Sequence, residues 1–215
     1  MKAMILAAGY GKRMQAHTDV PKPLIKVHNT TLIERNILAL KNAGIKEIVI
    51  NVSYKADQII SHLDDGAQHG VSIEYSIEKT PLETGGGVKK ALPLLSDHFI
   101  VLSADIWTDY PFNTLLSKRE AHVVLVKHKE KGDFGLEEQQ VIVGDRQLTY
   151  ANIAVLSKAL FSSYQDDYFP LSHVLYDAVH RGVVTGEYYE GCWYNVGSPQ
   201  VLTQLNARTS TGNSL

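Results

Sequence analysis

The chain has 215 residues, of which 44% are hydrophobic and 20% charged, and these values suit one globular domain with a buried core. Its formal net charge of -2 excludes the strong basic field that favours nucleic-acid binding. The single cysteine, Cys192, excludes an intramolecular disulfide and a cysteine-rich metal site. The sequence has no run of about 18 apolar residues and no signal-peptide core, so we expect a cytoplasmic protein without a membrane partner.

The N-terminal half alternates short apolar runs with amphipathic segments. Thr31 and Glu34 have the spacing of a capping box, and Gly44 is well placed to end the helix that follows. Alternation at this spacing indicates βαβ units and a parallel sheet that is covered on both faces. The pattern predicts strands at residues 4–7, 47–52, 71–76 and 99–102, and helices at 31–44, 57–63 and, after a glycine run, 88–95.

After about residue 110 the alternation becomes less regular. The pattern predicts strands at residues 122–126 and 153–156 and near 193, a small β excursion at 132–150, and helices at 171–179 and from about 199. The expected fold class is therefore α/β, with a Rossmann-like, mixed, mostly parallel sheet flanked by helices. We expect one domain at residues 1–208 and a frayed polar tail at 209–215.

A glycine loop follows the first predicted strand. Glycines such as Gly9 and Gly11 let the backbone approach a ligand and point N–H groups at phosphate oxygens, while Lys12 and Arg13 add positive charge. A dinucleotide fingerprint would need glycine or alanine in place of Met14 and a helix at once, whereas the sequence here predicts a continuing polar loop. The Gly-Lys-Ser/Thr of a P-loop is absent.

A rigid lysine segment follows this loop. Pro21 and Pro23 restrict the backbone on both sides of Lys22, as a phosphate-binding lysine requires. A solvated lysine in a rigid loop is the alternative, and the segment by itself favours that alternative.

The two segments together resemble the sugar-1-phosphate nucleotidyltransferase family. Its signature is a strand followed by Gly-x-Gly-x-Arg-Met/Leu and, about ten residues later, by Pro-Lys-Pro-Leu, which residues 9–14 and 21–24 match. The resemblance extends over residues 1–205, with further matching segments at 82–87, 104–110 and 194–198. Within the family, the chain is most similar to the short bacterial N-acetylmuramate 1-phosphate uridylyltransferases of cell-wall recycling. Mannose-1-phosphate guanylyltransferases are close relatives of that subgroup.

The resemblance implies an α/β fold of the nucleotide-diphospho-sugar transferase type and in-line attack by a sugar 1-phosphate on the α-phosphorus of a nucleoside triphosphate. Because two polyanions must meet, catalysis depends on positioning and charge neutralisation. The implied catalytic residues are Arg13, Lys22 and Asp105, and the last follows a strand end, where open α/β sheets place ligands. The implied nucleotide-binding residues are Ala8, Gly9, Gly11, Lys12, Arg13, Lys22, Thr84, Gly85 and Gly86. Glu83, Asp133 and Asn152 are implied to bind substrate, and Asp105 and Asn195 to bind Mg²⁺. The alternative for Asp133 and Asn152 is a role as turn residues, and the sequence leaves open whether Glu83 contacts the nucleotide or the sugar.

Asn195 departs from the family pattern, in which many relatives carry a second metal-binding aspartate. An asparagine oxygen still suits Mg²⁺ but binds it less strongly, so the number of metal ions stays open. Two other hypotheses are a nucleotide- or sugar-phosphate-binding relative that has lost catalysis, and a dinucleotide-dependent oxidoreductase. The sequence leaves the base and the sugar open, and we expect a monomer or a simple homodimer.

Overall fold

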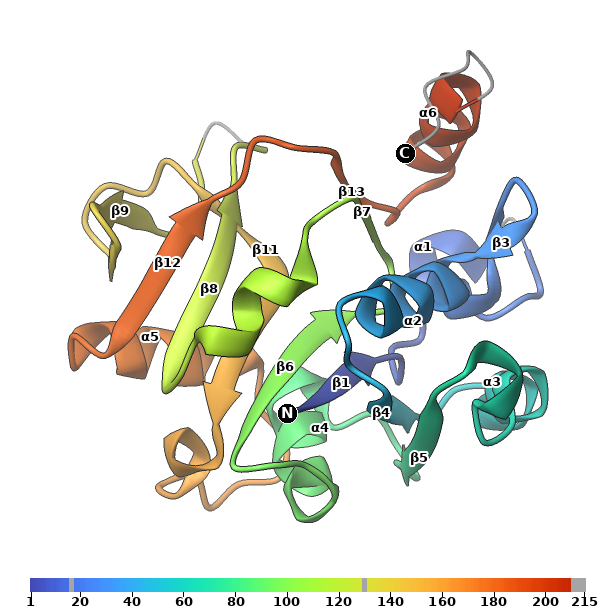
Figure 1. Ribbon diagram of the computed structural model, residues 1–215, viewed down its shortest axis with the longest axis horizontal. Coiled ribbons are helices and arrows are strands. Elements are labelled where there is room, and N and C mark those ends of the chain that lie inside the picture. The colour runs from blue at the N-terminus through green and yellow to red at the C-terminus, as the bar shows by residue number, and fades with distance from the viewer. Residues whose placement is uncertain (16–17, 129–130, 210–215) are drawn as a thin grey trace.

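The computed structural model describes residues 1–15, 18–128 and 131–209. Within them, one nine-stranded sheet has the strand order β5–β4–β1–β6–β11–β8–β12–β10–β9 (Figure 1). Its strands are β1 (Lys2–Leu6), β4 (Glu47–Val52), β5 (Ser72–Ile77), β6 (His98–Ser103), β8 (Ala121–Val126), β9 (Gly135–Glu137), β10 (Gln140–Ile142), β11 (Thr149–Ser157) and β12 (Val184–Tyr188).

The sheet is mixed, and most of its strands share one direction. β5, β4, β1 and β6 are parallel, and β8 and β12 form a second parallel pair. Of the strands in the described ranges, β10 and β11 are the ones that oppose this direction. This confirms the predicted fold class, including a small β excursion, which β9 and β10 form.

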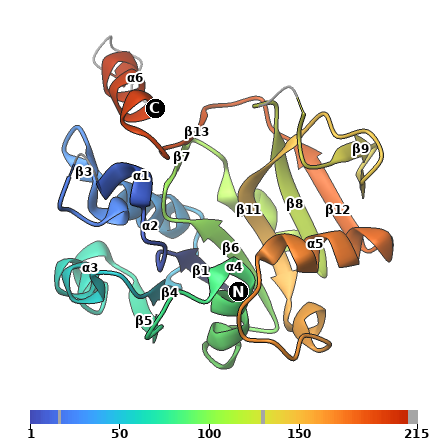
Figure 2. The ribbon, with the colours of Figure 1, turned by 180° about the vertical axis from the view of Figure 1, so that it is seen from behind.

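Helices cover both faces of the sheet (Figures 1 and 2). One face packs against α2 (Leu32–Asn42), α3 (Ala56–Leu63) and the 3-10 helix η4 (Phe112–Ser117), and the other against α4 (Glu83–Ala91) and α5 (Leu171–His180). Successive strand residues alternate between these two apolar clusters, so Ile100 and Leu102 pack on one side and Phe99 and Val101 on the other. Burial on both faces explains the continuous apolar runs in the sequence.

The predicted start and end of α2 are confirmed. The Glu34 N–H donates to Thr31 Oγ1 at 3.2 Å, and the Thr31 N–H donates to Glu34 Oε2 at 2.8 Å, which completes the capping box. Gly44 follows the helix with φ 86°, a left-handed conformation that glycine adopts without a steric penalty.

Two helices differ from the prediction. α4 begins at Glu83 and contains the glycine run, whereas the sequence predicted a helix only from residue 88. Tertiary packing is the reason: a Cβ at Gly85 would lie 2.4 Å from Phe169 Cδ2, and one at Gly86 would lie 2.0 Å from the Asp167 carbonyl oxygen. The short helix α1 (Lys12–Gln15) lies where a continuing polar loop was predicted. The prediction also omitted β12 and the short strand β7 (Ile106–Thr108).

Short elements complete the chain beside the main sheet. β7 pairs with β13 (Trp193–Asn195), β2 (Lys26–Val27) pairs with β3 (Thr30–Thr31), and α6 (Pro199–Thr209) packs near them. A third apolar cluster joins these elements and consists of Met14, Ile25, Val27, Leu32, Trp107, Val196 and Leu205. The predicted tail lies outside the described residues beyond Thr209, and the single-domain prediction stays a prediction.

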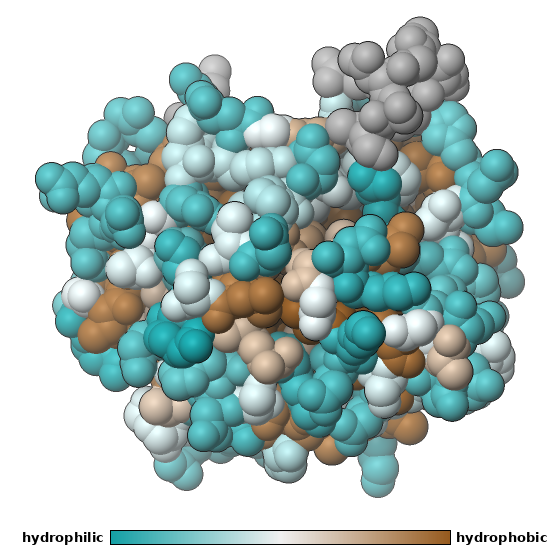
Figure 3. Space-filling model, in the orientation of Figure 1, coloured by the Kyte–Doolittle hydropathy of each residue, from teal (hydrophilic) through white to brown (hydrophobic). Residues whose placement is uncertain are grey.

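The molecular face that carries α2 and η4 is largely hydrophilic, with smaller apolar patches between its polar groups (Figure 3). None of the helices in the described ranges has the length and apolarity that a membrane crossing needs.

Candidate active site

The larger cavity, of about 630 Å³, lies at the carboxyl ends of β1 and β6. β1 is the switch point of the sheet, because the chain adds β4 and β5 on one side of β1 and then returns to add β6 on the other. Leu6 pairs with Ser103, so the glycine loop and Asp105 leave the sheet side by side. Of the predicted site residues, Ala8, Gly9, Gly11, Lys12, Arg13, Lys22, Glu83, Thr84 and Asp105 line this cavity.

Lys22 reaches the cavity beside Gly11. A Cβ at Gly11 would lie 3.2 Å from the Lys22 Cβ, and Gly11 has φ +62°, so both space and backbone conformation favour glycine there. The 3-10 helix η1 (Lys22–Leu24) fixes the lysine, whose Nζ forms an ion pair with Asp105 Oδ2. The structure therefore brings together a cation and a carboxylate that are 83 residues apart in the chain.

The β7–β13 ladder places Asn195 next to Asp105. Asn195 pairs with Ile106, and the Val196 N–H donates to the Asp105 carbonyl oxygen at 2.9 Å. Oδ1 of Asp105 and Oδ1 of Asn195 are both buried and accept no hydrogen bond from any described residue. Two buried oxygens without donors fit an oxygen-seeking cation such as Mg²⁺, which keeps several waters and needs only one or two protein ligands. Over the described ranges, no group of three or more His, Cys, Asp or Glu side chains forms a larger cluster that could hold a metal.

Arg13 lies at the junction of this cavity with a second one of about 420 Å³. Both cavities are lined by Arg13 and Gly197. A Cβ at Gly197 would lie 3.1 Å from Arg13 Nη2 and 3.3 Å from Asn195 Oδ1. The missing side chain of Gly197 therefore leaves room for both the Arg13 guanidinium and the Asn195 amide oxygen.

The second cavity collects Asp133, Asn152 and Asn195, three of the predicted site residues. Asp133 is held in place because its Oδ2 accepts the Tyr150 N–H at 2.9 Å. Asn152 has φ +57° at an irregularity of β11, where the pairing with β8 shifts between Tyr150 and Ala154. Thr149 also lines this cavity, and its buried Oγ1 has no partner within the described part of the chain. A left-handed asparagine and an unpaired hydroxyl indicate a surface shaped for a polar ligand.

Glu83, for which the sequence left open a contact with the nucleotide or with the sugar, lines the larger cavity. It starts α4 with φ +63°, and its Oε1 accepts the Tyr168 hydroxyl at 3.2 Å. The negative charge of Glu83 and this hydrogen bond raise the pKa of Tyr168. Gly85 and Gly86 line neither cavity, and their N–H groups donate to the Phe169 carbonyl oxygen at 2.9 and 3.0 Å. The structure gives these two glycines a packing role.

Sequence reasoning did not identify Asn51 and Glu78, two buried polar residues of the larger cavity. Asn51 Oδ1 accepts the Ala7 N–H at 2.9 Å, Asn51 Nδ2 donates to Glu78 Oε1 at 2.7 Å, and Glu78 Oε2 accepts the Leu82 N–H at 2.9 Å. This chain of bonds connects the start of the glycine loop to the start of α4. Their position at the ends of predicted parallel strands is the signal that could have found them.

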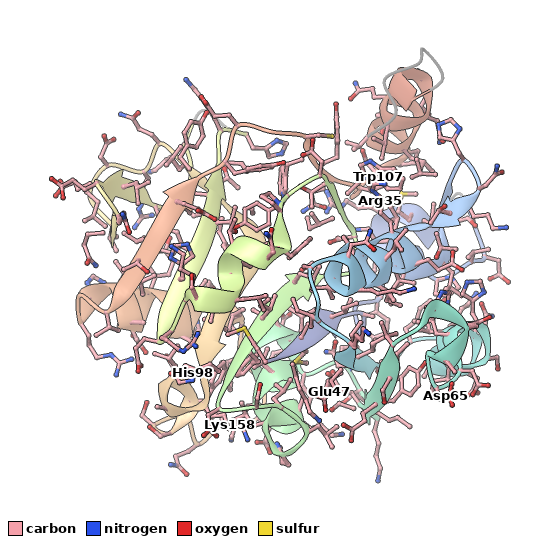
Figure 4. The ribbon with its side chains drawn as sticks, viewed as in Figure 1. Arg35, Glu47, Asp65, His98, Trp107 and Lys158 are labelled. Atoms are coloured by element: carbon pink, nitrogen blue, oxygen red, sulfur yellow. The ribbon has the colours of Figure 1, made fainter. Side chains whose placement is uncertain are left out.

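The third apolar cluster anchors the segments that carry Arg13, Lys22, Asp105 and Asn195. Met14 follows Arg13, Ile25 lies three residues after Lys22, Trp107 two after Asp105, and Val196 directly after Asn195. The guanidinium carbon of Arg35 lies 4.3 Å from the centre of the Trp107 ring, and the two side chains lie beneath α6 (Figure 4). Burial lowers the pKa of Arg35. The cluster thus holds four separate segments in one arrangement.

Known proteins resemble this chain in sequence and in fold. Residues 2–146 match the family model described as nucleotidyl transferase. The chain is 37% identical to the N-acetylmuramate alpha-1-phosphate uridylyltransferase of Neisseria meningitidis serogroup B, over 96% of this chain and 97% of that protein. It is 38% identical to the mannose-1-phosphate guanyltransferase of Candida albicans, over 68% of this chain but 42% of that longer protein.

Solved structures show the same fold. The inositol-1-phosphate CTP transferase from T. maritima superposes with a TM-score of 0.81 at 20% identity, covering 100% of this chain and 98% of the other. HddC from Yersinia pseudotuberculosis complexed with GMP-PN has a TM-score of 0.78 at 22% identity, with 97% and 99% covered. Because the family model matches residues 2–146 and the Neisseria relative matches nearly the whole chain, the chain belongs to the nucleotidyl transferase family and is one of its sugar-1-phosphate nucleotidyltransferases.

Proposed function

We propose that the chain transfers UMP from UTP to N-acetylmuramate 1-phosphate, which gives UDP-N-acetylmuramate and pyrophosphate. The observation that carries the reaction is the Lys22–Asp105 ion pair beside the glycine loop, with Asn195 held next to Asp105 by the β7–β13 ladder. The buried Oδ1 atoms of Asp105 and Asn195 lack donors among the described residues. The uridylyltransferase of Neisseria meningitidis supports this choice of substrates, because it matches the chain over nearly its whole length.

The larger cavity is proposed to hold the nucleotide and the second cavity the sugar. Gly9 and Gly11 offer backbone N–H groups to phosphate oxygens, and Arg13 holds the leaving phosphates at the junction of the cavities. Lys22 neutralises charge at the α-phosphate, between nucleophile and leaving group. The sugar phosphate is already an anion, so the reaction needs no strong general base. Asp133 and Asn152 are placed to bind sugar hydroxyl or amide groups.

Asp105 and Asn195 are proposed to hold Mg²⁺ through their buried Oδ1 atoms. Bound Mg²⁺ would supply further neutralisation of phosphate charge and would help to orient the phosphates. Lys22 keeps the second oxygen of Asp105 occupied, so that carboxylate is oriented before substrate arrives. The proposal includes a cytoplasmic location and a role in cell-wall recycling, because both follow from the proposed substrates.

A pyrophosphate-release screen tests the proposal. UTP, GTP, CTP, ATP and dTTP are each combined with N-acetylmuramate, mannose, glucose and N-acetylglucosamine 1-phosphates in Mg²⁺. We expect the highest kcat/KM for UTP with N-acetylmuramate 1-phosphate. Preference for GTP with mannose 1-phosphate would overturn the substrate assignment and favour the guanyltransferase relatives.

A further inference from the structure

Two tyrosine side chains of the larger cavity are exposed to solvent. Tyr10, between the two glycines of the loop, is 44% exposed, and Tyr168, in the segment before α5, is 66% exposed. Both line the cavity, although they come from segments far apart in the sequence. Single exposed aromatic residues are common on protein surfaces, but two at one cavity are available to cover a ligand that enters it.

Each ring is restrained by its neighbours. The Tyr168 hydroxyl donates to Glu83 Oε1 at 3.2 Å. The Tyr10 ring centre lies 5.9 Å from that of Tyr54, and Lys12 Nζ lies 5.6 Å from the Tyr10 ring centre. A side chain that is already restrained loses less entropy when a ligand packs against it. The two rings are therefore partly preorganised for a flat ligand.

The charged and the aromatic side chains of the larger cavity suit different parts of a nucleotide. Arg13 and Lys22 offer positive charge to phosphates, whereas Tyr10 and Tyr168 offer apolar faces. A nucleoside triphosphate has both kinds of surface, a polyanionic chain and a planar base. We infer that Tyr10 and Tyr168 form an aromatic gate that packs against the base and ribose of the bound nucleotide. This inference rests on the proposed function only in assigning the larger cavity to the nucleotide.

The gate predicts binding that depends on the base being present and tolerates different bases, because every base has a π-face. Calorimetry on the full chain measures the Kd of UTP, GTP and inorganic triphosphate. Tyr168→Ala removes one ring and is expected to raise the Kd of UTP and of GTP by roughly tenfold each. This factor lies in the lower part of the free-energy range for stacking one base on an aromatic side chain. The Kd of inorganic triphosphate is expected to stay unchanged. Tyr10→Ala is expected to act in the same direction.

Two further variants serve as controls. One distinguishes the effect of the Tyr168 ring from that of its hydroxyl, and the other measures the effect of losing an exposed tyrosine elsewhere. Tyr168→Phe keeps the ring and is expected to retain nucleotide affinity. Tyr188→Ala removes a 42% exposed tyrosine of β12 that lines neither cavity, and is expected to leave all three Kd values unchanged. Thermal melts of every variant check that the fold is kept.

The inference is overturned if Tyr168→Phe weakens nucleotide binding as much as Tyr168→Ala does, since the hydroxyl contact with Glu83 would then be responsible for the loss of affinity. Equal weakening of inorganic triphosphate also overturns it, because the effect would come from the phosphate region. Wild-type protein that binds neither UTP nor GTP contradicts both the gate and the nucleotide cavity. Wild-type protein that binds nucleotides without turnover contradicts the proposed function alone, and the Kd values of the variants still decide on the gate.

Discussion

The two cavities meet at Arg13 and Gly197 but are built in different ways. The larger one takes most of its wall from short runs that directly follow β1, β5 and β6, namely residues 6–14, 78–84 and 103–105. The second takes separate side chains from β11, α5, β13 and the region of α6. Phosphate binding needs successive backbone N–H groups and therefore a continuous segment, whereas sugar binding needs only side chains that meet in space. The first region consequently consists largely of short continuous motifs in the sequence. The second has no such motif, although its residues Asp133, Asn152 and Asn195 were each predicted from the family resemblance.

Asp105→Asn is expected to have the largest effect, since it removes the charge that pairs with Lys22 and a proposed metal ligand. We expect kcat for pyrophosphate release to fall by roughly 10²–10³-fold with an unchanged melting temperature. Asp97→Asn, at a largely exposed side chain, is the matched control and should retain wild-type turnover. Unchanged turnover of Asp105→Asn at limiting Mg²⁺ would remove Asp105 from the metal site.

Lys22→Met tests the charge of the larger cavity without removing the length of the side chain. The loss of positive charge near the α-phosphate is expected to lower kcat/KM by about 10²-fold. Lys26→Met, at an exposed lysine of β2, serves as the control. A variant with near-normal kcat/KM would show that Lys22 only orients Asp105.

Gly197→Ala tests the point that the two cavities share. The added methyl group would lie 3.1 Å from Arg13 Nη2 and 3.3 Å from Asn195 Oδ1, so either group must move. We expect kcat/KM to fall about tenfold for both substrates, since small displacements at a reacting centre are costly. Gly144→Ala, where nothing lies within 4 Å of the added atom, should have no effect. A loss confined to one substrate would contradict a shared junction.

Asn152→Gly tests the second cavity alone. Glycine keeps the left-handed backbone of this position while it removes the amide, so the bulge of β11 is retained. We expect the KM of the sugar 1-phosphate to rise by roughly five- to tenfold, as for one lost hydrogen bond, with the KM of UTP unchanged. A rise in the KM of UTP instead would assign Asn152 to the nucleotide side.

Asn195→Asp is expected to have the smallest effect and the opposite sign. A carboxylate binds Mg²⁺ more strongly than an amide oxygen, so half-maximal turnover should require a severalfold lower Mg²⁺ concentration. The measurement is a Mg²⁺ titration of initial rates at saturating substrates. A titration curve that does not move would place Asn195 outside the metal site.

The sequence alone determined the parallel half of the sheet, α2 with its cap, and the segment that carries Gly9, Gly11, Arg13 and Lys22. These features are local, because apolar periodicity, a capping box and proline or glycine restrictions act within a few residues. The same local reasoning was wrong for the start of α4, because Phe169 and Asp167, about 80 residues away, decide what fits there. A propensity rule has no access to such a contact.

Only the tertiary structure decided how the functional segments meet. The β7–β13 ladder sets Asn195 beside Asp105, the third apolar cluster holds both, and the bond chain through Asn51 and Glu78 connects two loops. Each of these depends on pairing between distant segments, and long-range pairing leaves no periodic signal in the sequence. The tertiary structure also placed Glu83, Tyr10 and Tyr168 at one cavity. The residue types that carry the chemistry could therefore be identified one by one in the sequence, whereas their arrangement into one site depends on the folded chain.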